Sequence, residues 1–169
     1  MAELSALVLG IDPGPSKSGW ALLDFSIASA PVWFGGGIGE NIGVILHTIG
    51  CQIGAPIDLV CVERPKALHN PMANVPVIET AWAGGFIAGH VDARGWRVQE
   101  VGPHQWRVAL VGQPRAGEDV DHKVAAFLKR FVRQFPGRSN VHMRDAAGVA
   151  CVGYQMSRQG MGGIGGSHA

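Results

Sequence analysis

Apolar residues follow two different patterns along this chain. Five short, nearly continuous apolar stretches bounded by turn-forming residues predict strands, at residues 4–12, 19–26, 30–39, 57–63 and 96–101. Other apolar residues recur at helical spacing and predict helices, at residues 41–53, 75–94, 103–111, 122–135 and 144–158. Three strands come first, and the later strands alternate with helices. This order predicts an α/β fold in which a mixed sheet carries helices on both faces.

The chain is long enough to form one domain with its own hydrophobic core. It has 169 residues, of which 47% are hydrophobic and only 16% are charged, so a charge-rich disordered protein is excluded. We expect a single domain over residues 1–158 and a flexible Gly-rich tail over residues 159–169.

Several classes of protein do not fit the sequence. The longest apolar stretches are much shorter than the ~20 residues that span a bilayer, so we expect no membrane partner. The N-terminus also lacks the pattern of a secretory signal. The cysteines are odd in number and lack metal-ligand spacing: Cys51, Cys61 and Cys151. Reduced thiols and a cytoplasmic location are therefore the expectation.

Charge is distributed unevenly, although the net charge is only +1. Residues 1–93 carry 3 basic and 8 acidic residues, a balance of −5, whereas residues 94–144 carry 10 basic and 4 acidic residues, a balance of +6. A basic segment on an otherwise acidic protein is typical of a surface that binds a polyanion. A solvated helix face explains the charges equally well, so charge alone leaves both readings open.

Acidic residues stand at the ends of two predicted buried strands. Asp12 and Glu63 each end such a strand and are closely followed by proline, and ligands gather at the carboxyl ends of strands in an open α/β sheet. His142 and Asp145 are three residues apart at the start of the last predicted helix, where they share a face. Each acid alone has an ordinary explanation as a turn or helix-end residue. Together they are oxygen and imidazole donors suited to Mg²⁺ or Mn²⁺.

Several short segments stand in a fixed order along the chain: GIDPG (10–14), SG (18–19), VE (62–63), GPHQWR (102–107) and HMRDAA (142–147), with a glycine at 112. In order and spacing, over residues 6–156, they resemble the motifs of RuvC-type Holliday junction resolvases. The resemblance implies an RNase H-like fold with a five-stranded mixed sheet flanked by helices. It also implies a homodimer that makes paired nicks in opposed strands of four-way junction DNA during DNA recombination and repair. It does not identify a branch-migration partner.

The resemblance also assigns candidate site residues. Four residues match the family's catalytic metal ligands, for two Mg²⁺ ions per active site with Mn²⁺ as the other possibility: Asp12, Glu63, His142 and Asp145. His142 stands where many members carry a carboxylate, and an uncharged imidazole there implies either weaker binding of the second metal or a preference for Mn²⁺. A rival alignment would place Asp145 at the earlier position and Gly148 at the later one; the spacing of three favours the first alignment.

Basic residues complete the expected site. Arg107 and Lys123 match positions near the scissile phosphate, where they would also act in catalysis. We expect DNA to be bound by Lys66, His69, Arg107, Arg115, Lys123 and Arg130. The apolar helix predicted at 75–94 is the expected dimer surface. The tryptophans are expected in the core or the dimer interface rather than stacked on bases, and Trp106, beside Arg107, is the one that would lie nearest the DNA.

Three other functions compete with this reading. A nuclease of the same RNase H fold would act on other branched DNA, flaps or RNA–DNA hybrids with the same chemistry. A non-catalytic nucleic-acid-binding module of this fold would not need all four ligands. The actin and sugar-kinase superfamily begins with a similar Gly-Asp turn but requires two such lobes, and the sequence has no second copy of the motif.

Overall fold

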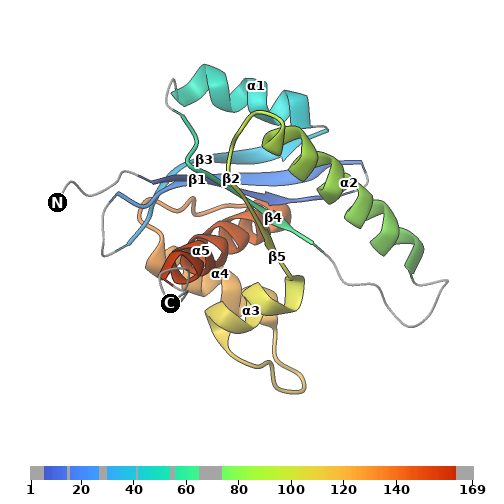
Figure 1. The fold of residues 1–169 in the computed structure, drawn as a ribbon. Coiled ribbons are helices and arrows are strands. Elements are labelled where there is room, and N and C mark those ends of the chain that lie inside the picture. The colour runs from blue at the N-terminus through green and yellow to red at the C-terminus, as the bar shows by residue number, and fades with distance from the viewer. Residues whose placement is uncertain are drawn as a thin grey trace, which may run out of the picture.

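Strands and helices alternate much as the apolar patterns predict. The computed structural model describes residues 6–14, 16–26, 30–40, 42–53, 56–64 and 74–162. Within these residues the elements are, in order, β1 (Leu7–Asp12), β2 (Ser18–Asp24), β3 (Val32–Gly39), α1 (Ile42–Ile53), β4 (Leu59–Glu63), α2 (Asn74–Asp92), β5 (Val98–Val101), α3 (Pro103–Val111), α4 (Val120–Phe131) and α5 (Val141–Gly162) (Figure 1).

The described strands form one mixed sheet in the order β3-β2-β1-β4-β5. The first three strands pair antiparallel, whereas β4 runs parallel to β1 and β5 runs parallel to β4. In the β1–β4 ladder Ile11 pairs with Val62. Asp12 and Glu63 therefore follow directly at the same end of two adjacent parallel strands, as the sequence predicts.

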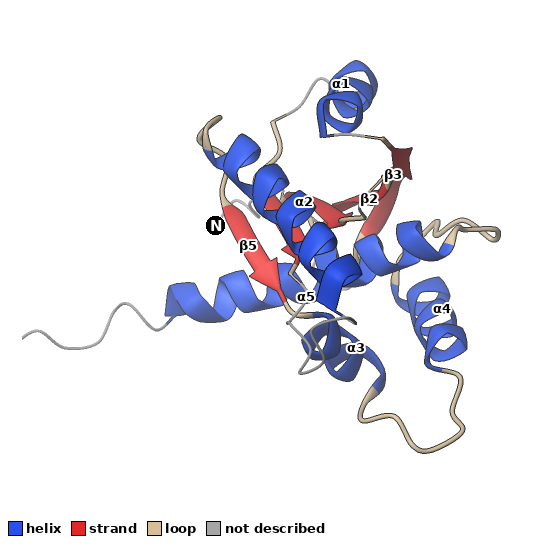
Figure 2. Cartoon of the chain, turned by 90° about the vertical axis from the view of Figure 1, so that its right-hand side faces the viewer, coloured by secondary structure: helices blue, strands red, loops and turns tan. Residues whose placement is uncertain are grey.

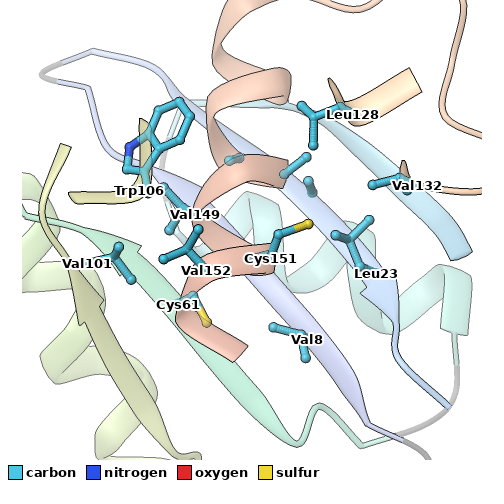
Figure 3. Packing of buried hydrophobic residues seen from close by; sticks show 14 of the residues in the cluster. Val8, Leu23, Cys61, Val101, Trp106, Leu128, Val132, Val149, Cys151 and Val152 are labelled. Atoms are coloured by element: carbon cyan, nitrogen blue, oxygen red, sulfur yellow. The ribbon is translucent and has the colours of Figure 1, made fainter. Parts of the chain in front are cut away.

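Helices cover both faces of the sheet. α1 and α2 lie on one face, and α5 lies on the other with α3 and α4 beside it (Figure 1 and Figure 2). Side chains alternate between the faces along each strand. Leu9 and Val62 belong to the buried cluster under α1 and α2, whereas Val8 and Cys61 belong to the cluster under α5. Figure 3 shows the second of these, in which Val8 and Cys61 on the sheet lie beneath Cys151 and its neighbours on α5.

Glycines allow α5 to lie unusually close to the sheet. A Cβ atom at Gly10 of β1 would overlap the backbone oxygen of Ala146, and one at Gly19 of β2 would overlap the backbone of His142. A Cβ on the helix side, at Gly153, would overlap Cys61 Sγ. The first turns of α5 are therefore held against the ends of β1 and β2.

The bounds of α4 and α5 differ most from the sequence prediction. α4 ends at Phe131 rather than at 135, because the next residues turn away to pair with the sheet edge: Trp33 N–H donates to the Arg133 carbonyl at 2.9 Å and Arg133 N–H donates to the Pro31 carbonyl at 2.8 Å. α5 starts at Val141 and continues to Gly162, so the helix passes the expected domain boundary at 158 and the first residues of the expected tail are helical. Residues 163–169 lie outside the described part of the chain. No described helix is long and apolar enough to cross a membrane.

Candidate active site

The four predicted metal ligands lie together beside the N-terminus of α5. Asp12 and Glu63 stand at the ends of β1 and β4, and by strand alternation from Gly10 and Cys61 both face α5. His142 and Asp145 come from the first turns of α5. The three acids are nearly buried, with exposed fractions of 9% for Asp12, 8% for Glu63 and 9% for Asp145. The sequence-predicted grouping is therefore present.

Each acid is turned toward one neighbouring side chain. His142 Nδ1 lies 2.7 Å from Asp12 Oδ2. The Trp106 Nε1–H group donates a hydrogen bond of 2.6 Å to Glu63 Oε2. Arg107 Nη2 donates one of 2.7 Å to Asp145 Oδ2, and the two residues form a salt bridge. A buried carboxylate without such a partner would be strongly destabilising.

These hydrogen bonds do not offset the loss of solvent around the acids. Burial raises the pKa of Glu63 from 4.5 to about 7, against the lowering effect of the Trp106 hydrogen bond, and repulsion from Asp12 and Asp145 adds to the rise. Burial likewise raises the pKa of Asp145 from 3.8 to about 6, against the lowering effect of the Arg107 charge. The pKa of Asp12 is also raised by burial, although His142 opposes the shift. The cluster therefore favours a bound positive charge.

The donor types in this cluster fit a divalent metal ion. Carboxylate oxygens are the preferred ligands of Mg²⁺, and Mn²⁺ accepts an imidazole as well. Among the described residues, however, no three His, Cys, Asp or Glu side chains are already arranged around one ion position. In this structure one oxygen of each acid lies within hydrogen-bond distance of His142, Trp106 or Arg107. Metal ligation by these residues therefore stays a prediction.

The predicted basic residues fall into four groups. Arg107 is in the site, where its side chain is about one-third exposed beside Asp145. Lys123 on α4 instead pairs with Glu118, with Nζ 2.6 Å from Oε2, and contacts none of the four candidate ligands. Arg115 and Arg130 are exposed. Lys66 and His69 lie outside the described residues.

This chain is similar to known proteins in both sequence and structure. No protein-family model matches it. The crossover junction endodeoxyribonuclease RuvC of Wolbachia sp. subsp. Brugia malayi (strain TRS) is 24% identical over 153 residues, which cover 85% of this chain and 90% of that protein.

The solved structures that resemble this chain are also Holliday junction resolvases. Thermus thermophilus RuvC in complex with a Holliday junction substrate has a TM-score of 0.68 at 20% identity, covering 92% of this chain and 96% of that one. The yeast mitochondrial Holliday junction resolvase Ydc2 has a TM-score of 0.60 at 11% identity, covering 92% and 80%. This chain resembles RuvC-type resolvases in sequence and in fold. The five-stranded mixed sheet of the RuvC and RNase H-like fold is thus confirmed.

One residue of this RuvC-like site was not found by sequence reasoning. The sequence favours a core or interface position for Trp106 over base stacking, and its side chain is indeed completely buried and cannot stack on a base. It donates a hydrogen bond to Glu63, and the guanidinium carbon of Arg107 lies over its ring, 4.5 Å from the ring centroid. The only sequence signal for such a role is its position directly before Arg107 in the GPHQWR segment.

Proposed function

We propose that this protein is an endonuclease that resolves four-way (Holliday) DNA junctions by metal-dependent paired nicking of opposed strands, in DNA recombination and repair. The observation that carries the proposal is the cluster of three buried acids and His142 at the common end of β1, β4 and α5. The likeness to RuvC supports it, since the matched T. thermophilus structure holds a Holliday junction substrate.

Asp12, Glu63, His142 and Asp145 are the residues that would hold the metal. The resemblance to RuvC implies dependence on a divalent metal, and we propose Mg²⁺, with Mn²⁺ as the alternative, at two ions per site. Such ions supply an activated water and stabilise the leaving oxygen of a phosphodiester. The raised pKa values of Glu63 and Asp145 support this assignment, because a nearby cation would favour the charged forms of both.

Arg107 is the side chain best placed to act on the scissile phosphate. Its guanidinium is held between the Trp106 ring and Asp145, and it is partly open to solvent. A guanidinium offers several donors in a fixed plane, which suits binding two phosphate oxygens at once. We therefore propose that Arg107 binds the scissile phosphate and stabilises the charge that develops during cleavage.

The DNA around the cleavage point would lie along the basic segment. Arg115 lies between α3 and α4, and Lys123 and Arg130 are on α4, next to the helix that carries His142 and Asp145 (Figure 2). Basic side chains on such a surface bind phosphates without reading sequence. Lys123 would exchange Glu118 for a DNA phosphate. Lys66 and His69 stay in the proposal on the resemblance alone.

Paired nicking requires two active sites, and we propose that a homodimer provides them. α2 carries the most exposed large apolar side chain among the described residues, Phe86, which is 66% exposed. Gly85 and Gly89 lie on the same side of the helix, and a Cβ atom on either would meet nothing within 4 Å. An exposed aromatic ring between glycines allows the close approach of a second copy.

A cytoplasmic location stays a prediction from the cysteine usage; Cys61 and Cys151 are free and buried.

The test is cleavage of a labelled four-way junction beside matched linear duplex, flap and RNA–DNA hybrid, each with Mg²⁺, Mn²⁺ or EDTA. Paired metal-dependent nicks restricted to the junction would support the proposal. Cleavage of flaps or hybrids instead would favour the alternative nuclease of the same fold. Tight junction binding with no cleavage of any substrate would indicate a non-catalytic binding module.

A further inference from the structure

Trp106 contacts one acid of the candidate site directly and a second acid through Arg107. It is the largest completely buried side chain among the described residues. Its indole N–H donates to Glu63 Oε2 at 2.6 Å, while the face of the ring lies against the Arg107 guanidinium, which in turn donates to Asp145. Two consecutive residues of α3 thus contact acids that come from β4 and from α5.

The packing around the ring leaves it little freedom. α5 presents Gly148 to the ring, and a Cβ atom there would lie 2.7 Å from Cζ3 of Trp106. The ring is part of the apolar cluster under α5, which Figure 3 shows. A side chain this tightly packed holds its hydrogen-bond donor in one place.

The hydrogen bond has a direct effect on the Glu63 carboxylate. A buried indole N–H requires an acceptor, and the acceptor here is Oε2 of a nearly buried acid. With Oε2 fixed to the indole, Oε1 is the oxygen left to serve as a metal ligand. Partners of this kind, bound to the ligand rather than to the metal, set the orientation of ligating groups.

We propose that Trp106 is a positioning residue of the metal site: its N–H orients the Glu63 carboxylate for metal binding, and its ring face keeps Arg107 beside Asp145. This inference rests on the proposed function. A purely structural Trp106 would need its volume but not its N–H group, and this difference can be measured.

The test compares Trp106→Phe with Leu110→Ala as a matched control. Leu110 lies on the same helix and packs on the same part of α5, next to Gly148, but its aliphatic side chain has no hydrogen-bond donor for an acid. Mn²⁺ affinity is measured by calorimetry without DNA, junction affinity is measured in EDTA, and folding is followed by thermal melting. Trp106→Phe should weaken Mn²⁺ binding by roughly 10–100-fold, the usual effect of losing a partner of a metal ligand. Junction affinity should stay unchanged, and Leu110→Ala should keep wild-type Mn²⁺ affinity.

Cleavage gives a second readout. In Trp106→Phe the Mn²⁺ concentration for half-maximal cleavage should rise by the same factor as the dissociation constant, while cleavage at saturating Mn²⁺ recovers. Wild-type Mn²⁺ affinity in folded Trp106→Phe, or an equal loss in Leu110→Ala, would overturn the positioning role.

A second variant separates the N–H group from the ring volume. Replacing Trp106 by 3-benzothienylalanine keeps the ring shape and substitutes sulfur for the N–H, so it remains informative if Trp106→Phe fails to fold. The same loss of Mn²⁺ affinity is expected, and an unchanged affinity would overturn the proposal. If the wild type binds Mn²⁺ but cuts no junction, the proposed function fails while the effect of Trp106 on Mn²⁺ affinity is still tested. If the wild type binds no Mn²⁺, both fail.

Discussion

Replacing Glu63 by Gln should stabilise the metal-free protein at neutral pH. Burial raises the pKa of this acid from 4.5 to about 7, so the folded protein binds its proton more tightly than the unfolded chain does. Between pH 4.5 and about pH 7 the unfolded chain therefore loses this proton, whereas the folded protein retains it. The free energy of unfolding therefore falls as the pH rises through this window and stays low above it.

The size of the effect follows from the shift. At ~1.4 kcal/mol for each pH unit, the rise in the pKa of Glu63 corresponds to about 3 kcal/mol. In a protein of this length that equals roughly 6–12 °C in Tm. Asp145, whose pKa is raised to about 6, changes stability in the same direction. The Glu63→Gln protein should lose the part of the pH dependence of stability that Glu63 causes and keep the part that Asp145 causes, because an amide does not ionise.

The assay is thermal unfolding in EDTA at about pH 5 and about pH 8, with Glu40→Gln as a control. Glu40 is exposed, so its replacement should leave Tm unchanged at both pH values. Mn²⁺ added at the higher pH should raise the Tm of the wild type more than that of Glu63→Gln, since a ligand of the folded state stabilises it. A wild-type Tm that rises between the two pH values, or a Glu63→Gln protein less stable than wild type at the higher one, would refute this reasoning.

Three further predictions concern packing, catalysis and assembly. Gly148→Ala should destabilise the fold by ~1–2 kcal/mol in urea unfolding, since the new methyl overlaps Trp106, whereas Gly85→Ala, with open space around it, should gain up to ~1 kcal/mol from helix propensity. Arg107→Ala should lower the maximal cleavage rate by roughly 10²–10³-fold with little change in junction affinity, and a wild-type rate would remove Arg107 from the site. Phe86→Ser should shift the protein from dimer to monomer in sedimentation, and an unchanged dimer would place the interface elsewhere.

Much of the fold was predictable because its central strands are buried on both faces. β1 and β4 appear in the sequence as unbroken apolar runs, and each ends at an acid that a buried strand would not otherwise contain. Adjacent parallel strands bring those ends together, so Asp12 and Glu63 could be predicted to meet. The spacing of His142 and Asp145 likewise placed both at one helix face.

Other features depend on contacts between residues far apart in the sequence, which periodicity does not report. The amphipathic pattern of α4 continues past Phe131, but pairing of Arg133 with β3 ends the helix there. Trp106 stands beside Arg107 in the sequence, but its contact with Glu63 depends on a donor aimed at an acid 43 residues away. Lys123 matched a catalytic position by sequence, yet in the structure its charge is paired with Glu118.

The most direct test of the central claim uses a supercoiled plasmid that extrudes a cruciform. Two nicks placed across the junction convert the plasmid to linear DNA, whereas unpaired nicks give open circles. We expect linear product from the wild type only when Mg²⁺ or Mn²⁺ is present, and none from Asp12→Asn, which should still bind a four-way junction. Linear product in EDTA, or equal product from Asp12→Asn, would contradict the assignment of this acid cluster as a metal-dependent nuclease site.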